Sequence, residues 1–139
     1  QQPLIVACLP DADEEKAAQL QEKGVEVLRI PGVTTADITE EQKEVISLPV
    51  LMKELGARKI DGILLEGGGQ LNESALQAGI VDRIYCYIAP KIFGGAQAKT
   101  PVEGQGLTRA ADAWKFNRIG MQEFGQDILL EYEKAQELQ

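Results

Sequence analysis

The sequence predicts an α/β fold with a mainly parallel sheet whose last two strands are antiparallel to each other. Strand-like and helix-like segments alternate through the first half of the chain, and right-handed crossovers turn such an order into parallel strands. The continuous apolar run at residues 4–9 is typical of a strand buried on both faces. No helical segment separates the strands expected at 113–122 and 128–132, so these two should form an antiparallel pair.

The first three elements are a strand, a helix and a strand. Pro10 ends the strand at 4–9, and Asp11 or Asp13 can cap the helix that follows. Gly24 stands where the end of that helix is expected. Residues 25–30 alternate between apolar and polar side chains, which predicts a half-buried strand.

The rest of the chain is expected to hold two more helices and four more strands, with two long loops. Residues 31–46 are polar and contain an acidic cluster, which predicts a long loop with a helical turn around 39–45. The remaining elements are predicted from the positions of proline and glycine, which mark element ends, and from the periodicity of apolar residues. They are a helix at 48–56, a strand at 60–66, a helix at 71–78, a strand at 81–89, a loop at 90–106 and the two strands named above.

Composition indicates one soluble globular domain and excludes several classes of function. The chain has 139 residues, of which 44% are hydrophobic, and carries 14 basic against 22 acidic side chains, a net charge of −8. An acidic chain lacks the attraction that non-specific nucleic-acid binding needs. With no histidine there can be no Ser-His or Cys-His catalysis and no histidine zinc site. Cys8 and Cys86 are expected to be small buried strand residues, and no metal site, membrane span or signal peptide is expected.

Three consecutive glycines, Gly67, Gly68 and Gly69, form the main candidate site. A turn between a strand and a helix surrounds an anion with backbone N–H groups, and glycine lets a phosphate approach closely. The spacing matches neither the G-x-G-x-x-G nor the G-K-[ST] phosphate loops. On these residues alone, a phosphate-binding turn and a tight turn without a ligand both remain open. Lys91, Arg83 and Arg109 are the basic groups available to offset the acidic charge of the chain.

Four segments together resemble a known family. They are Leu65-Glu66-Gly67-Gly68-Gly69, the helix that follows to 79, residues 81–82 with 87–95, and residues 99–104. They resemble the reductase domain of the bifunctional riboflavin-biosynthesis deaminase–reductase, and the resemblance spans nearly all of the chain. It implies a dihydrofolate-reductase-like fold: a mainly parallel sheet with helices on both faces and antiparallel C-terminal strands. That domain begins before the match to Gln1, so this chain is expected to be its C-terminal part, an incomplete domain that does not suffice for catalysis alone.

The resemblance also implies an activity and site residues. It implies the NADPH-dependent reduction of 5-amino-6-(5-phosphoribosylamino)uracil to its ribitylamino form, in the cytoplasm, with the hydride delivered to C1 of the opened ribose. Glu66 matches an acid that contacts the substrate, although an acid satisfied by neighbouring backbone N–H groups is the alternative. The positions that match the cofactor-binding segment are Gly68, Gly69, Gln70, Leu71, Asn72, Glu73 and Ser74. No catalytic residue is assigned.

A second hypothesis belongs to a different class of protein. The chain could be a non-catalytic module that binds a nucleotide or phosphate, or that serves dimerisation. Apolar residues between 114 and 132 have little helix left to cover them, and exposed strand faces invite a partner. A homodimer through this region is therefore expected, with a strand pair that completes the chain's own sheet as the alternative.

Overall fold

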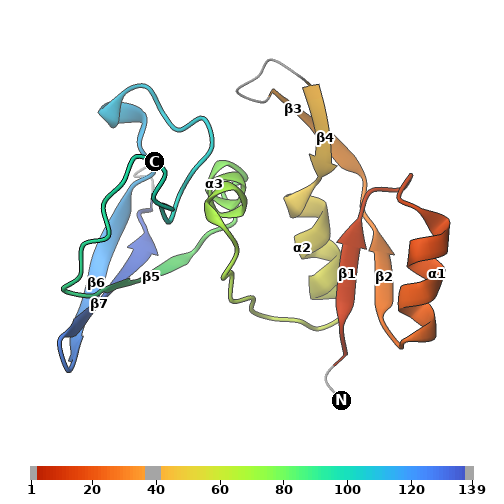
Figure 1. Ribbon diagram of the computed structural model, residues 1–139, viewed down its shortest axis with the longest axis horizontal. Helices are drawn as coiled ribbons and strands as arrows, with labels where there is room; N and C mark the ends of the chain where they lie inside the picture. The colour runs from red at the N-terminus through yellow and green to blue at the C-terminus, as the bar shows by residue number, and fades with distance from the viewer. Residues whose placement is uncertain (1–2, 37–41, 137–139) are drawn as a thin grey trace. The chain divides into compact units, whose positions relative to one another are not determined.

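The computed structural model describes residues 3–36 and 42–136, which form two compact units (Figure 1). The first unit is Gln1–Leu65 and the second is Glu66–Gln139. The expectation of a single domain stays a prediction. No helix in the described part of the chain is long and apolar enough to cross a membrane.

The first unit begins with the expected strand, helix and strand. β1 (Ile5–Cys8) and β2 (Glu26–Arg29) pair in parallel, with α1 (Glu14–Glu22) between them in the chain. Of the two candidate caps, the structure selects Asp13, whose Oδ1 accepts a hydrogen bond from the backbone N–H of Lys16 at 3.0 Å. Gly24 has φ +80°, the left-handed conformation that commonly follows a helix end. The β1 side chains are only half-buried, so the expected burial on both faces is wrong.

The loop predicted at 31–46 is instead a β-hairpin. β3 (Gly32–Ala36) pairs antiparallel with β4 (Gln42–Ile46), and the predicted helical turn falls partly on β4 and partly on 39–41, outside the described residues. The β-branched run from Val33 to Thr35 favours a strand, a local preference that the polar neighbours obscured. The next helix, α2 (Leu48–Ala57), confirms the prediction at 48–56, with proline in its first turn.

The strand predicted at 60–66 is absent, and this is the main correction to the fold. Residues 60–68 belong to no helix or strand, and Leu64 remains 74% exposed. A short apolar run satisfies its backbone groups as a strand only when a neighbouring strand lies beside it. Here the segment lies at the boundary between the two units, and no strand pairs with it in the described structure.

The second unit joins one helix to an antiparallel three-stranded sheet. α3 (Gly69–Gln77) precedes β5 (Arg83–Ile88), a short 3₁₀ helix follows at Ala110–Asp112, and β6 (Phe116–Phe124) and β7 (Asp127–Lys134) close the chain. The strand order is β5-β7-β6. The two-residue turn between β6 and β7 has Gly125 at φ +64°, as a type II′ hairpin turn requires at its first central position.

The α/β class is confirmed, whereas the mainly parallel sheet is wrong for the strands that the structure describes. Only β1 and β2 are parallel, and the other two sheets are antiparallel. The last two strands do pair antiparallel, as predicted. The missing strand at 60–66 explains the difference, because it was the element expected to extend the parallel pairing into the second half. Figure 1 shows α1 and α2 to either side of the β1–β2 pair, whereas in the described part of the second unit α3 is the one α-helix that accompanies the three-stranded sheet.

Candidate functional site

The glycine turn forms the N-terminal end of α3. Gly68 is the capping residue, with φ −65° and ψ 169°, and the helix starts at Gly69, two residues before the predicted start. The first helical hydrogen bond runs from the N–H of Asn72 to the carbonyl of Gly68, at 3.1 Å. The preceding N–H groups of the first turn therefore have no acceptor within the helix, and they lie at the positive end of the helix dipole.

The three glycines serve different purposes. A Cβ added at Gly67 would lie 2.5 Å from Leu71 Cδ2, and one added at Gly69 would lie 2.8 Å from Glu103 Cδ. A Cβ added at Gly68 would meet no atom within 4 Å. None of the three has a positive φ, so packing rather than backbone conformation explains Gly67 and Gly69. Gly68 alone is open, as a position that a ligand approaches should be.

The predicted cofactor segment also carries side chains that bond within the chain. Asn72 Nδ2 donates to the carbonyl of Pro101 at 2.8 Å, and Ser74 Oγ donates to the carbonyl of Gln70 at 3.0 Å. Glu73 is buried and accepts a hydrogen bond from the N–H of Gly106 at 3.0 Å. The side chains of Asn72, Glu73 and Ser74 are therefore already engaged, whereas Gln70 and Leu71 are exposed.

Glu66 lies directly before the glycines and is exposed. Among the described residues, no hydrogen bond or ion pair engages its side chain. The alternative in which neighbouring backbone N–H groups satisfy this carboxylate is therefore not seen. An exposed carboxylate beside an open helix start is free to accept hydrogen bonds from the hydroxyl groups of a ligand.

Of the three candidate basic groups, two are engaged elsewhere. Arg109 makes two hydrogen bonds to Asp112, at 2.7 and 2.9 Å, and this bonding raises the pKa of its guanidinium. The pKa of Arg83 is raised by hydrogen bonding to Tyr85 and by the nearby charge of Glu133. Lys91 is exposed, and among the described residues no hydrogen bond or ion pair engages its side chain. Of these three side chains, Lys91 is therefore the one that is not engaged within the described part of the chain.

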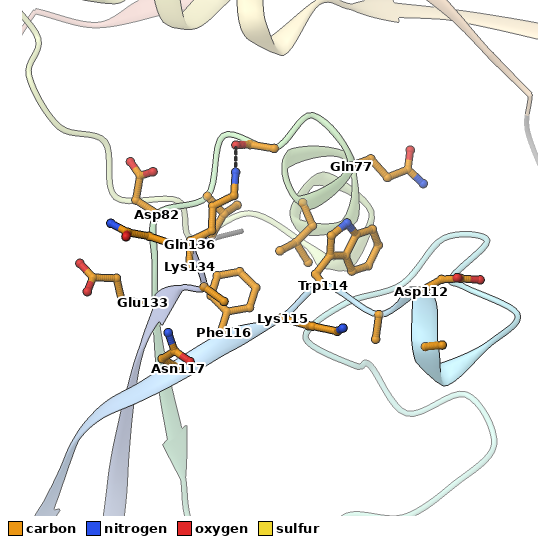
Figure 2. Close-up of a pocket in the computed structure, with 16 residues that line it drawn as sticks. Gln77, Asp82, Asp112, Trp114, Lys115, Phe116, Asn117, Glu133, Lys134 and Gln136 are labelled. Carbon is orange, nitrogen blue, oxygen red and sulfur yellow. Dashed lines mark hydrogen bonds between the residues drawn. The ribbon is translucent and has the colours of Figure 1, made fainter. Parts of the chain in front are cut away.

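A broad groove lies at the opposite end of α3 (Figure 2). Trp114 and Phe116 form part of its wall, Gln77 lines it from the helix, and Lys134 Nζ donates to the carbonyl of Gly79 at 2.9 Å. None of the predicted site residues lines this groove. The candidate site and the groove are therefore separate features of the second unit. The sequence did not reveal the groove, because the apolar pattern of 113–117 is the same for a groove wall as for an ordinary strand.

The fold and the glycine turn together define an α/β protein with an open, glycine-capped helix start. The model of the RibD C-terminal domain family matches residues 1–130, and the chain belongs to this family. The resemblance in the sequence is thereby confirmed.

Relatives and solved structures agree with this assignment. The chain is 41% identical over 128 residues to the riboflavin biosynthesis protein RibD of Actinobacillus pleuropneumoniae, covering 92% of this chain and 31% of that protein. It is 30% identical over 130 residues to the 2,5-diamino-6-ribosylamino-4(3H)-pyrimidinone 5′-phosphate reductase of Methanothermobacter thermautotrophicus, covering 94% of this chain and 55% of that protein. The structure of Acinetobacter baumannii RibD, form 2, is similar in fold, with a TM-score of 0.70 at 19% identity, covering 94% of this chain and 37% of that one. The chain thus spans about a third to a half of the length of these relatives.

Proposed function

We propose that this chain supplies part of the cofactor and substrate cleft of an NADPH-dependent reductase of riboflavin biosynthesis. Its substrate would be 5-amino-6-(5-phosphoribosylamino)uracil, reduced to the ribitylamino form. The open backbone at Gly68, at the start of α3 in a chain of the RibD C-terminal domain family, carries the proposal. The name of the Methanothermobacter relative, a reductase of a pyrimidine ribose phosphate, supports this substrate class.

The described residues fit two roles in such a cleft. The backbone N–H groups at the start of α3, beside Gly68, would hold a cofactor phosphate, because Gly68 is open and the helix dipole favours an anion. Glu66 would accept hydrogen bonds from the substrate. A bound NADPH would supply the hydride for C1 of the opened C1=N form, and with a proton on the nitrogen the products would be NADP⁺ and the ribitylamine. The protein's part is to orient the two ligands, and no histidine is needed for that.

Three further statements belong to this proposal. The complete domain would have a dihydrofolate-reductase-like fold, which the likeness to RibD structures supports. The cofactor would be NADPH rather than NADH, and the enzyme would act in the cytoplasm. The competing candidate is a non-catalytic phosphate-binding or dimerisation module. The same open helix start would also serve a module that only binds phosphate.

An activity assay on the full-length protein separates the two functions. The substrate is mixed with NADPH or NADH, and the loss of the reduced nicotinamide absorbance is followed. We expect substrate-dependent oxidation, faster with NADPH. If no oxidation occurs while NADPH or inorganic phosphate raises the melting temperature, the binding-module hypothesis replaces the reductase.

The exposed apolar residues of β6 support a homodimer. Ile119 is 48% exposed beside the register shift between Arg118 and Gly120, and Met121 and Phe124 are also exposed. Leu129 is only 5% exposed, so it packs within this chain and is not a suitable position for testing an interface. The alternative, in which the strand pair only completes the chain's own sheet, leaves the exposed apolar side chains of β6 unexplained.

We expect a dimer in solution that Ile119→Lys converts to a monomer, because a charge there would be buried without a partner. Light scattering at several protein concentrations measures the mass. Gln126→Lys, in the exposed β6–β7 turn, is the matched control and should remain dimeric. A parent protein that is monomeric at micromolar concentration would contradict the dimer.

A further inference from the structure

The carboxylate of Glu73 is the anchor of a distant loop. This side chain on α3 is 7% exposed, and its Oε1 accepts hydrogen bonds from the N–H of Gly106 at 3.0 Å and from Gln77 Nε2 at 3.1 Å. Gly104 has φ +89°, and a Cβ added there would collide with the same carboxylate. The backbone of 104–106 thus wraps closely around Glu73. A buried carboxylate without partners is costly, so the loop and the side chain stabilise each other.

Two further hydrogen bonds hold the same loop, defined here as residues 100–106, against α3. Asn72 Nδ2 donates to the carbonyl of Pro101 at 2.8 Å, and the N–H of Glu103 donates to the carbonyl of Gly69 at 3.1 Å. The three anchoring positions on the helix are 69, 72 and 73, which are spaced i, i+3 and i+4 and so share one face. The loop therefore covers one face of the first two turns, and the capping residue Gly68 stays open.

We propose that Glu73 is a positioning residue of the cofactor site rather than a group that touches the cofactor. Through Gly106 it fixes the loop 100–106 against the first turn of α3, so that the N–H groups beside Gly68 are held ready for a phosphate. Both oxygens of Glu73 face the chain's own loop: Oε1 accepts two hydrogen bonds, and Oε2 lies against Gly104. This inference rests on the proposed function, because it assigns a role within that cofactor site.

The test compares variants of the full-length protein by NADPH titration calorimetry and by steady-state kinetics. Glu73→Ala removes the acceptor, so the loop is no longer held in place before the cofactor binds. We expect the KM and Kd for NADPH to rise about tenfold, because binding must then also order the loop, while kcat stays within about twofold. Glu73→Gln keeps an oxygen that can accept from Gly106, so it should bind NADPH like the parent. This rescue by the uncharged isostere separates positioning from a direct ionic contact.

Gly104→Ala approaches the same contact from the loop and keeps the test valid if Glu73→Ala fails to fold. Its Cβ would displace the carboxylate, so the KM for NADPH should again rise. Gly125→Ala is the matched control, since Gly125 also has a positive φ but a Cβ added there would meet no atom within 4 Å. Gln77→Ala removes the other donor to Glu73 and should leave the KM unchanged.

Hydrogen exchange of the Gly106 amide, without cofactor, reports on the anchor directly. We expect slow exchange in the parent and in Glu73→Gln, and faster exchange in Glu73→Ala. If Glu73→Gln weakens NADPH binding as much as Glu73→Ala, or if Gly104→Ala leaves the KM unchanged, the positioning role is wrong while the proposed function stands. A parent protein that does not bind NADPH would overturn the proposed function and this role with it.

Discussion

Replacing Gly68 with valine is expected to abolish NADPH binding and to leave the fold largely intact. The backbone of Gly68, at φ −65° and ψ 169°, is one that valine adopts without strain. A side chain there would meet no atom of the protein within 4 Å, so it would project into the space that a phosphate needs. Valine caps a helix less well than glycine, a cost of about 1 kcal/mol that a folded domain should tolerate.

Calorimetric titration of the full-length protein with NADPH measures this effect, and a thermal melt checks the fold. Gly62→Val is the matched control, because Gly62 is also open and also lacks a positive φ, yet lies outside the cofactor segment. It should bind NADPH normally. Gly69→Val is a poorer probe, since its side chain would first displace Glu103. Unchanged affinity in Gly68→Val would remove the phosphate-binding role of the turn.

Replacing Glu66 with glutamine is expected to lower turnover by about five- to tenfold with little change in NADPH affinity. The carboxylate is exposed beside the glycine turn, and no described residue pairs with it. A hydrogen bond from a substrate hydroxyl contributes about 1.5–3 kcal/mol with a charged acceptor and about 0.5–1.5 kcal/mol with a neutral one. Glutamine would therefore keep the hydrogen bond but lose about 1–1.5 kcal/mol of it.

Steady-state kinetics that vary each ligand in turn separate the two effects. Asp61→Asn removes another exposed carboxylate from the same segment and serves as the control, with normal turnover expected. If the Glu66→Gln variant turns over substrate normally but binds NADPH weakly, Glu66 contacts the cofactor rather than the substrate.

The sequence predicted those elements that local signals determine. An aspartate cap before the first helix, the helix that proline opens at Leu48 and the antiparallel pair β6–β7 each depend on neighbours within a few residues, although the sequence left Asp11 and Asp13 as alternative caps. The strand predicted at 60–66 failed because a strand needs a partner, and apolar character alone does not provide one. The hairpin β3–β4 was missed because its polar residues resemble those of a loop.

The candidate site divides in the same way. The glycine run and the helix behind it were visible in the sequence, and the structure locates both at the start of α3. The separate purposes of Gly67, Gly68 and Gly69 were not visible, since they depend on what a side chain would meet. The bond between Glu73 and Gly106 joins residues 33 positions apart, and no local pattern reports such a contact.

The most direct test of the account follows the backbone amide signals of the protein by nuclear magnetic resonance during a titration with NADPH. The account predicts that the largest shifts fall on Gly68, Gly69, Gln70 and Leu71, at the start of α3, with smaller shifts in the loop 100–106 that is anchored to it. Shifts confined to the groove around Trp114 and Lys134, or no shifts at all, would contradict the assignment of the cofactor site to the glycine turn.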